Sequence, residues 1–122
     1  MGRVTFESIG KALPGRRNLV VSSQKIEVPG IEVFSSVGDA LHATLPSVPV
    51  YFVGGLGIYE EAILEYATHA DVTYVPDVVE HPEAVRFPVE MLAAHFEASP
   101  LLDHEDEPTL KTQFFTRKDA LP

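Results

Sequence analysis

Residues Val50–Ala62 read VYFVGGLGIYEEA, and this stretch decides the expected fold class. Its first four residues are apolar and mostly β-branched or aromatic, which is typical of a strand buried in a sheet. Two glycines follow, and the periodicity of Ile58–Tyr66 predicts an amphipathic helix. Glycines between a strand and a helix let the backbone approach a ligand, and the N–H groups of the helix start favour phosphate. Tight packing of the helix on the strand would also explain the glycines.

The flanking segments extend this pattern. The periodicity predicts two further helices, Val4–Ile9 and Val37–Thr44, and four further strands, Asn18–Ser22, Ile31–Phe34, Asp71–Val75 and Leu110–Arg117. Residues 77–108 are rich in acids and prolines and predict long surface loops around possible strand residues at Phe96–Ser99. We therefore expect an α/β fold in a single domain over residues 1–122. Its sheet is expected to be mainly parallel and flanked by helices, with antiparallel C-terminal strands.

Composition narrows the class of protein. The chain has 122 residues and no cysteine, which excludes disulfides and thiolate chemistry. Neither a signal peptide nor an apolar run of membrane-spanning length is present, so we expect a cytoplasmic protein with no membrane partner. The five histidines lack metal-ligand spacing, and no metal site is predicted.

The charge is distributed unevenly along the chain. The net charge is −9, which argues against a nucleic-acid partner. Residues 1–30 nevertheless hold five Lys or Arg against two Glu, a balance of 5 − 2 = +3, while the remaining residues hold four cations against sixteen acids. A local cationic region on an acidic protein indicates a small anionic ligand, or simply a solvated loop.

Three short motifs in this cationic region could contact such a ligand. Ser22 and Ser23 follow a predicted strand, and Arg3 and Thr5 bracket the start of a predicted helix. Arg16 follows a Pro-Gly turn, where a rigid arginine can hold a carboxylate through two hydrogen bonds. Each motif alone is also compatible with an ordinary loop or a surface salt bridge.

Taken together, the motifs resemble one family closely. The segments MGR-x-T-F-E-S-I-G, L-P-G-R-x-N, L-V-V-S-S-Q and V-G-G-x-x-I-Y-E resemble dihydrofolate reductase, in that family's order and with its spacing. The resemblance extends from Met1 to about Arg117. It implies a reductase that transfers hydride from NADPH to 7,8-dihydrofolate, yielding tetrahydrofolate for one-carbon metabolism, and that binds antifolates as a monomer.

The resemblance also assigns cofactor contacts. Arg3, Val4 and Thr5 would hold the phosphates of NADPH, and Ser22, Ser23 and Gln24 would lie beside the adenosine ribose and its 2′-phosphate. No basic residue stands among these serines, so Arg3 would supply most of the charge. The pyrophosphate and nicotinamide would be lined by Gly54, Gly55, Leu56, Gly57, Ile58 and Tyr59, with a cis peptide between Gly54 and Gly55.

Substrate contacts follow in the same way. Arg16 would bind the α-carboxylate of the folate glutamate tail, Ile9 and Leu13 would pack on the aminobenzoyl group, and Val53 would lie near the pterin. Tyr59 and Thr73 would support the reaction, Tyr59 near the nicotinamide and Thr73 by orienting the catalytic carboxylate.

One departure concerns the start of the chain. In the family, a central strand, a mobile loop and the helix bearing the catalytic carboxylate precede the position of Met1. The resemblance therefore implies a chain truncated at its N-terminus, without the central strand and with no catalytic residue of its own. Two alternatives stay open: an inactive fragment or pseudoenzyme that keeps NADPH-binding elements, and a related pteridine- or pyrimidine-type reductase.

Overall fold

The computed structural model describes residues 1–76, 80–82 and 84–121. Its contacts divide the chain into two compact units, Met1–Tyr59 and Glu60–Pro122. The single domain expected from the sequence therefore stays a prediction. No helix in the described part of the chain is both long and apolar enough to span a bilayer.

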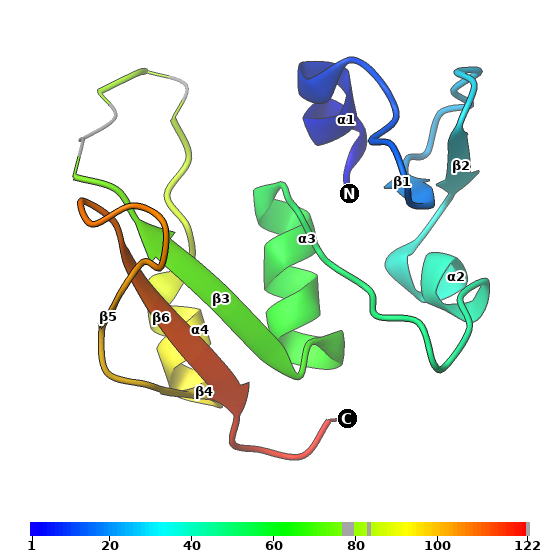
Figure 1. Ribbon diagram of the computed structural model, residues 1–122. Helices are drawn as coiled ribbons and strands as arrows, with labels where there is room; N and C mark the ends of the chain where they lie inside the picture. The colour runs from blue at the N-terminus through cyan, green and yellow to red at the C-terminus, as the bar shows by residue number, and fades with distance from the viewer. Residues whose placement is uncertain (77–79, 83, 122) are drawn as a thin grey trace. The chain divides into compact units, whose positions relative to one another are not determined.

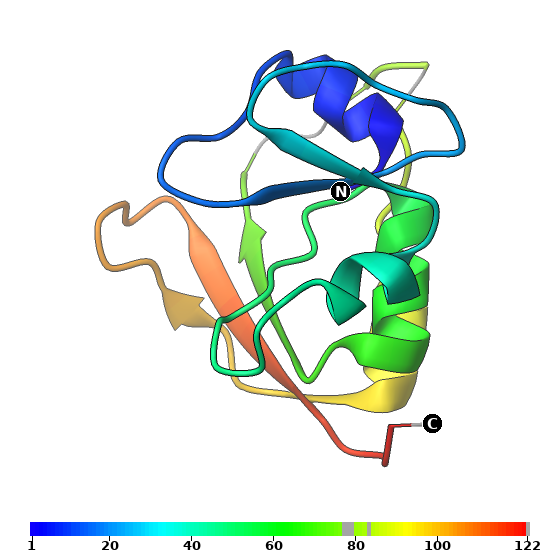
Figure 2. The same ribbon diagram turned by 90° about the vertical axis from the view of Figure 1, so that its right-hand side faces the viewer.

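The first unit is built on a pair of short parallel strands. Strand β1 (Asn18–Val21) pairs in register with β2 (Ile31–Phe34), as the two apolar runs predicted. Helix α1 (Arg3–Ile9) lies on one side of this pair and α2 (Val37–His42) on the other (Figures 1 and 2). The buried side chains between them are Phe6, Val20, Val37 and Ala40.

Helix α2 confirms the expected cap. The Ser36 hydroxyl accepts a hydrogen bond from the Asp39 N–H at 3.0 Å, which satisfies one of the free donors of the first turn. Asp39 also places a negative charge at the positive end of the helix. The sequence predicts this helix over Val37–Thr44, and in the structure it ends at His42, two residues earlier.

The prediction of a buried strand at Val50–Val53 is wrong. This segment forms no strand among the described residues, and Tyr51 and Val53 are 79% and 42% exposed. A run of apolar residues becomes a strand only when another backbone pairs with it, and its sequence does not carry that information. Directly after this segment, Gly54 O accepts a hydrogen bond from Gly2 N at 2.8 Å.

The predicted helix of Ile58–Tyr66 is present but has two parts. An α-helix, α3 (Leu56–Glu61), continues directly into a π-helical turn, η1 (Ala62–Tyr66). The wide turn is closed by a hydrogen bond of 2.7 Å from Ala67 N to Ala62 O. The boundary between the two units falls inside α3.

The second unit contains an antiparallel sheet. Strand β6 (Lys111–Arg117) pairs with β3 (His69–Tyr74) on one side and with the short strands β4 (Phe96–Ala98) and β5 (Leu102–Asp103) on the other. The sequence predicted β3 and β6 to within a few residues. Across β3 and β6, Tyr74 donates a hydrogen bond of 2.8 Å to the Gln113 amide oxygen.

Helix α4 (Val89–His95) was not predicted, because it lies in the segment expected to form long surface loops. The possible strand residues predicted in that segment, Phe96–Ser99, are confirmed as β4. The helix begins after Pro88. The acids and prolines around it make the periodicity of its apolar face hard to detect in the sequence. That face carries Leu92, which is 1% exposed and packs with Ile63, Phe96 and Phe115 in the core of the unit. Burying a side chain of this size contributes about 1.5–3 kcal/mol. Figure 2 shows α4, in yellow, beside the end of the green α3–η1 helix. Residues 77–79 and 83 of the predicted loops lie outside the described residues.

The sheet therefore differs from the expected, mainly parallel one. Among the described residues, one strand pair is parallel and three are antiparallel. Part of the difference lies at Val50–Val53, which the sequence predicts as a strand and which pairs with no strand in the described part of the chain. The coarser expectation of a mixed α/β chain is confirmed.

Candidate functional site

Three segments of the first unit meet at the start of α1. Gly2 N donates to Gly54 O at 2.8 Å, and Val21 N donates to Met1 O at 2.8 Å. The end of β1, the start of α1 and the glycine segment are thus held together by backbone hydrogen bonds. Most of the residues expected to contact a cofactor lie on these three segments.

The glycine segment makes the closest approach. The peptide bond between Gly54 and Gly55 is cis, as the resemblance implies. A side-chain carbon at Gly55 would lie 3.4 Å from the Thr5 hydroxyl oxygen, and one at Gly54 would lie 3.5 Å from the Tyr59 ring. Tyr59 N donates to Gly55 O at 2.9 Å and begins the helix there. Beside Gly57, by contrast, a side-chain carbon would meet nothing within 4 Å, so the backbone is open to a ligand.

The residues expected to contact the cofactor differ in whether their polar groups already have a partner within the protein. The Arg3 guanidinium forms an ion pair of 2.7 Å with Glu7, one turn along α1. Val4 is 68% exposed and contributes no polar group. The Ser22 hydroxyl accepts a hydrogen bond of 3.0 Å from Gln24 N, which shapes the turn after β1, and Ser23 and Gln24 are exposed.

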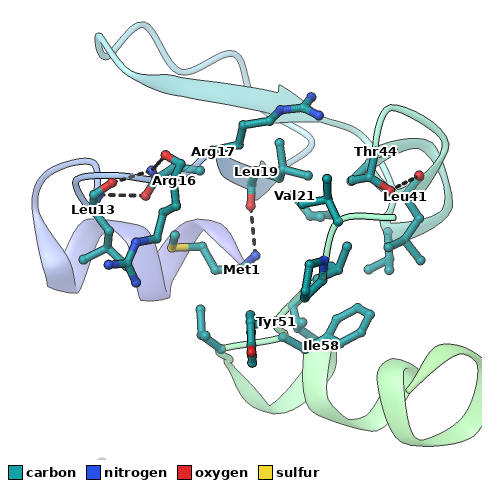
Figure 3. Close-up of a pocket in the computed structure, with 18 of the residues that line it drawn as sticks. Met1, Leu13, Arg16, Arg17, Leu19, Val21, Leu41, Thr44, Tyr51 and Ile58 are labelled. Carbon is teal, nitrogen blue, oxygen red and sulfur yellow. Dashed lines mark hydrogen bonds between the residues drawn. The ribbon is translucent and has the colours of Figure 1, made fainter. Parts of the chain in front are cut away.

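An apolar cavity of about 630 Å³ opens in the same unit. Its walls come from β1, α2 and the segment Val48–Val53, and Leu13 and Arg16 also line it (Figure 3). A cavity of this volume is within the usual range for small-molecule sites. Its lining contains two arginines and no aspartate or glutamate, so the polar end of a ligand held there would be anionic.

Asn18 fixes the turn that carries Arg16, and sequence reasoning missed its role. Its side chain is 3% exposed. It accepts a hydrogen bond of 2.7 Å from Leu13 N and donates to Leu13 O and Arg16 O at 2.9 and 3.0 Å. Gly15 in this turn has a φ of 74°, a conformation that glycine adopts without strain. The only signal in the sequence is an asparagine that follows the Pro-Gly turn after two arginines.

Arg16 and Arg17 have different roles. Arg16 donates from Nε to Pro14 O at 2.9 Å, and its terminal nitrogens have no partner among the described residues. Figure 3 shows Arg16 beside Leu13 and Met1. Arg17 binds both carboxylate oxygens of Glu32, at 2.8 and 2.7 Å, and donates to Ala43 O. This hydrogen bonding lowers the pKa of Glu32 and raises the pKa of Arg17. Arg17 therefore joins β2 to the end of α2, and Arg16 is the arginine available to a ligand.

Some expected residues are not brought together. Leu13, Arg16 and Val53 line the cavity, whereas Ile9, at the end of α1, does not. Leu56 is 38% exposed, and Ile58 lines the cavity. Thr73 lies on β3 in the second unit, opposite Thr112 of β6. Among the described residues, no cluster of acidic or histidine side chains could hold a metal ion.

The fold and the site define an α/β protein with a partly apolar cavity that two arginines line, beside a glycine-rich segment. Comparison with known sequences gives the family. The family model described as dihydrofolate reductase matches residues 1–117. This chain belongs to the dihydrofolate reductase family.

Individual relatives agree with this assignment. A dihydrofolate reductase of Buchnera aphidicola subsp. Acyrthosiphon pisum is 37% identical over 93 residues, which cover 72% of this chain and 57% of the relative. Dihydrofolate reductase type 3 of Salmonella typhimurium is 40% identical over 87 residues, covering 63% and 54%. A dihydrofolate reductase of Staphylococcus aureus is 47% identical over 64 residues, covering 52% and 38%. The chain spans about half the length of the curated relatives it matches.

Proposed function

We propose that this chain carries the NADPH-binding and dihydrofolate-binding surfaces of a dihydrofolate reductase. The position of Arg16 is the observation that supports the proposal most directly. Arg16 stands on a turn locked by Asn18, at an apolar cavity whose lining holds no acid. A folate has the complementary chemistry, an apolar ring system joined to a glutamate tail. This arginine also favours a folate over a pteridine or pyrimidine substrate without a carboxylate tail.

The cofactor surface is the second part of the proposal. Arg3 and Thr5 on α1, the turn Ser22–Gln24 and the open backbone at Gly57 would bind the phosphates and ribose of NADPH. Bound NADPH supplies the hydride, and the protein has to hold the acceptor ring beside it and exclude water. Gly57 supports this assignment, because it is exposed and the space beside its backbone is open. We place the protein in the cytoplasm as a monomer.

A second candidate function is binding without turnover. The observation that favours it is the absence of any aspartate or glutamate from the cavity lining. Reduction of the pterin needs a proton as well as a hydride, and a general acid has to lie within hydrogen-bond reach of the atom it protonates. We propose that this chain binds both ligands and turns over slowly or not at all by itself. NADPH oxidation that depends on dihydrofolate, at a rate typical of enzymes, would contradict this.

Binding of antifolates tests the role of Arg16. We expect Arg16→Leu to weaken an antifolate that bears a glutamate tail by roughly tenfold or more, since a hydrogen bond to a charged group contributes about 1.5–3 kcal/mol. An antifolate without the tail should bind Arg16→Leu and the unmodified chain equally. Isothermal titration calorimetry measures both affinities.

Arg17→Leu is the matched control, because its guanidinium is already occupied by Glu32 and Ala43. It should leave the ratio of the two affinities unchanged. Equal losses for both antifolates in Arg16→Leu would contradict the assignment of Arg16 to a carboxylate tail.

A further inference from the structure

The start of α1 and the turn after β1 lie side by side. Gly2 forms a parallel bridge with Val21, and neighbouring backbones in such a ladder are about 4.8 Å apart. Arg3 and Ser22 are the residues that follow this bridge on its two sides. The side chain of Arg3 therefore starts beside the turn Ser22–Gln24, where the adenosine end of the cofactor would lie in the proposed site.

Both cations next to this turn in the sequence or across the bridge already have an acidic partner. Arg3 Nη1 lies 2.7 Å from a carboxylate oxygen of Glu7, one turn along α1. Lys25 follows the turn directly, and its Nζ lies 3.0 Å from a carboxylate oxygen of Glu27. The charges of these four side chains sum to zero. The excess of positive charge in residues 1–30 therefore belongs to the other three cations.

The other residues expected around this end of the cofactor are uncharged. Val4 has an apolar side chain, and the segment from Gly54 to Tyr59 contains no Lys, Arg or His. The turn Ser22–Gln24 offers hydroxyl and amide groups, which suit the hydroxyls of a ribose. A phosphate monoester, by contrast, carries a charge of about −1.5 to −2 at neutral pH. Arg3 is thus the cation on which binding of a 2′-phosphate depends, and Glu7 occupies it.

We propose that Glu7 is a specificity-determining residue of the cofactor site, because it binds the guanidinium that a 2′-phosphate needs. As a result, the chain binds NADH, whose adenosine ribose carries a free 2′-hydroxyl, nearly as tightly as NADPH. This inference rests on the proposed cofactor surface and adds which dinucleotides that surface accepts.

A change of partner by Arg3 does not remove the effect of Glu7. An exposed ion pair contributes little to stability, so a phosphate can draw Arg3 away from Glu7. The Glu7 carboxylate then stays one helical turn from Arg3, on the same face of α1, and repels the phosphate. With Arg3 in either position, Glu7 reduces the gain in binding that the 2′-phosphate provides.

Isothermal titration calorimetry of the full chain with NADPH and with NADH tests the proposal. The ratio of the two dissociation constants isolates the 2′-phosphate, because the two molecules are otherwise identical. We expect a preference for NADPH of less than roughly tenfold, whereas hydrogen bonds from an unopposed charged group would give roughly tenfold to a hundredfold. Glu7→Gln keeps the size and the helix propensity of the side chain. It should tighten NADPH by roughly threefold or more and leave NADH unchanged.

Two further variants test how Glu7 acts. Glu105→Gln removes the same charge at an exposed position of the second unit and should change neither affinity. In an Arg3→Gln background, Glu7→Gln should gain much less for NADPH, because only the repulsion by Glu7 is then removed. An equal gain in both backgrounds would show that Arg3 is not involved and overturn the proposal.

The remaining outcomes separate this inference from the one on which it rests. A preference for NADPH above tenfold in the unmodified chain, or an equal change for both dinucleotides in Glu7→Gln, would overturn the role of Glu7 and leave the proposed cofactor surface standing. If neither dinucleotide binds saturably to the chain or to Glu7→Gln, the proposed cofactor surface is wrong, and the inference falls with it.

Discussion

At the scale of single residues, Asn18 contributes more than its position in the sequence suggests. It is the one buried polar residue identified in the described part of the chain, and its three hydrogen bonds hold the turn before β1. Because that turn presents Arg16, Asn18 is a positioning residue for the ligand site as well as a part of the fold.

We expect Asn18→Ala to destabilise the protein by about 2–3 kcal/mol, because it leaves the N–H and C=O of Leu13 and the C=O of Arg16 without their partner. Urea denaturation measures this change. Gln24→Ala, at an exposed position, is the control and should lie within about 0.5 kcal/mol of the unmodified chain. A loss for Asn18→Ala as small as that of the control would show that water replaces these bonds.

At the scale of elements, the short helix α2 depends on its first turn. Ser36→Ala removes the cap and should cost about 1 kcal/mol of stability. The neighbouring Ser35 also bonds to Asp39, but through exposed side chains at 3.2 Å. We therefore expect Ser35→Ala to cost less than about 0.5 kcal/mol. Denaturation of both variants compares the cap with a surface contact, and equal losses would contradict the assignment of Ser36 as the cap.

A second element contact joins η1 to the sheet. Arg117 of β6 has a side chain that is 5% exposed, lies 4.7 Å from the Phe96 ring and donates to Ala67 O and Ile63 O. We expect Arg117→Met to destabilise the chain by about 3 kcal/mol, since each bond from a charged donor contributes about 1.5–3 kcal/mol. Arg117→Lys keeps the positive charge and should recover part of this stability. The recovery should be incomplete, because a single ammonium cannot match the geometry of the guanidinium. Thermal or urea denaturation checks both, and an unchanged Arg117→Met would contradict this role.

The sequence predicts elements well where the information is local. Each of five elements could be predicted from its own residues: the strands β1, β2, β3 and β6 from their apolar runs, and helix α2 from its cap at Ser36. Val50–Val53 and helix α4 were not predicted correctly, because pairing and burial against distant residues decide them. The candidate site follows the same rule: the sequence singled out Arg16 and the glycines by type and order. It could not indicate the hydrogen bonds that Asn18 forms within its own motif, nor those that Arg17 forms with Glu32 and Ala43, which are distant in the sequence.

At the scale of the whole molecule, both units contain carboxylates that pairing stabilises. Hydrogen bonding to Arg17 lowers the pKa of Glu32 in the first unit. In the second unit, Lys111 lowers the pKa of Asp103, and His95, through a hydrogen bond of 2.7 Å, lowers the pKa of Asp119 with help from Arg117. A lowered pKa in the folded state means that the unfolded chain binds more protons in this range. The stabilisation is therefore present at neutral pH and is lost on acidification.

We expect the free energy of unfolding to fall as the pH drops from the ordinary pKa of aspartate and glutamate toward the lowered values. In Asp119→Asn the fall should be smaller, because that position no longer takes up a proton. Glu105→Gln, on an exposed turn, is the control and should keep the full acid sensitivity. Urea denaturation at a series of pH values measures the three curves. A steeper fall in the free energy of unfolding of Asp119→Asn on acidification would contradict this prediction.

The π-helical turn at Ala62–Tyr66 also affects how this chain compares with others. A hydrogen bond from Ala67 to Ala62 spans one residue more than an α-helix would use, so this turn contains one surplus residue. Leu64, which is 44% exposed, and Glu65 are the exposed residues of this turn, whereas Ala62 and Ile63 are buried in the core. When sequences of this family are aligned, a single-residue gap is therefore expected here, and no other residue on either side of it need change.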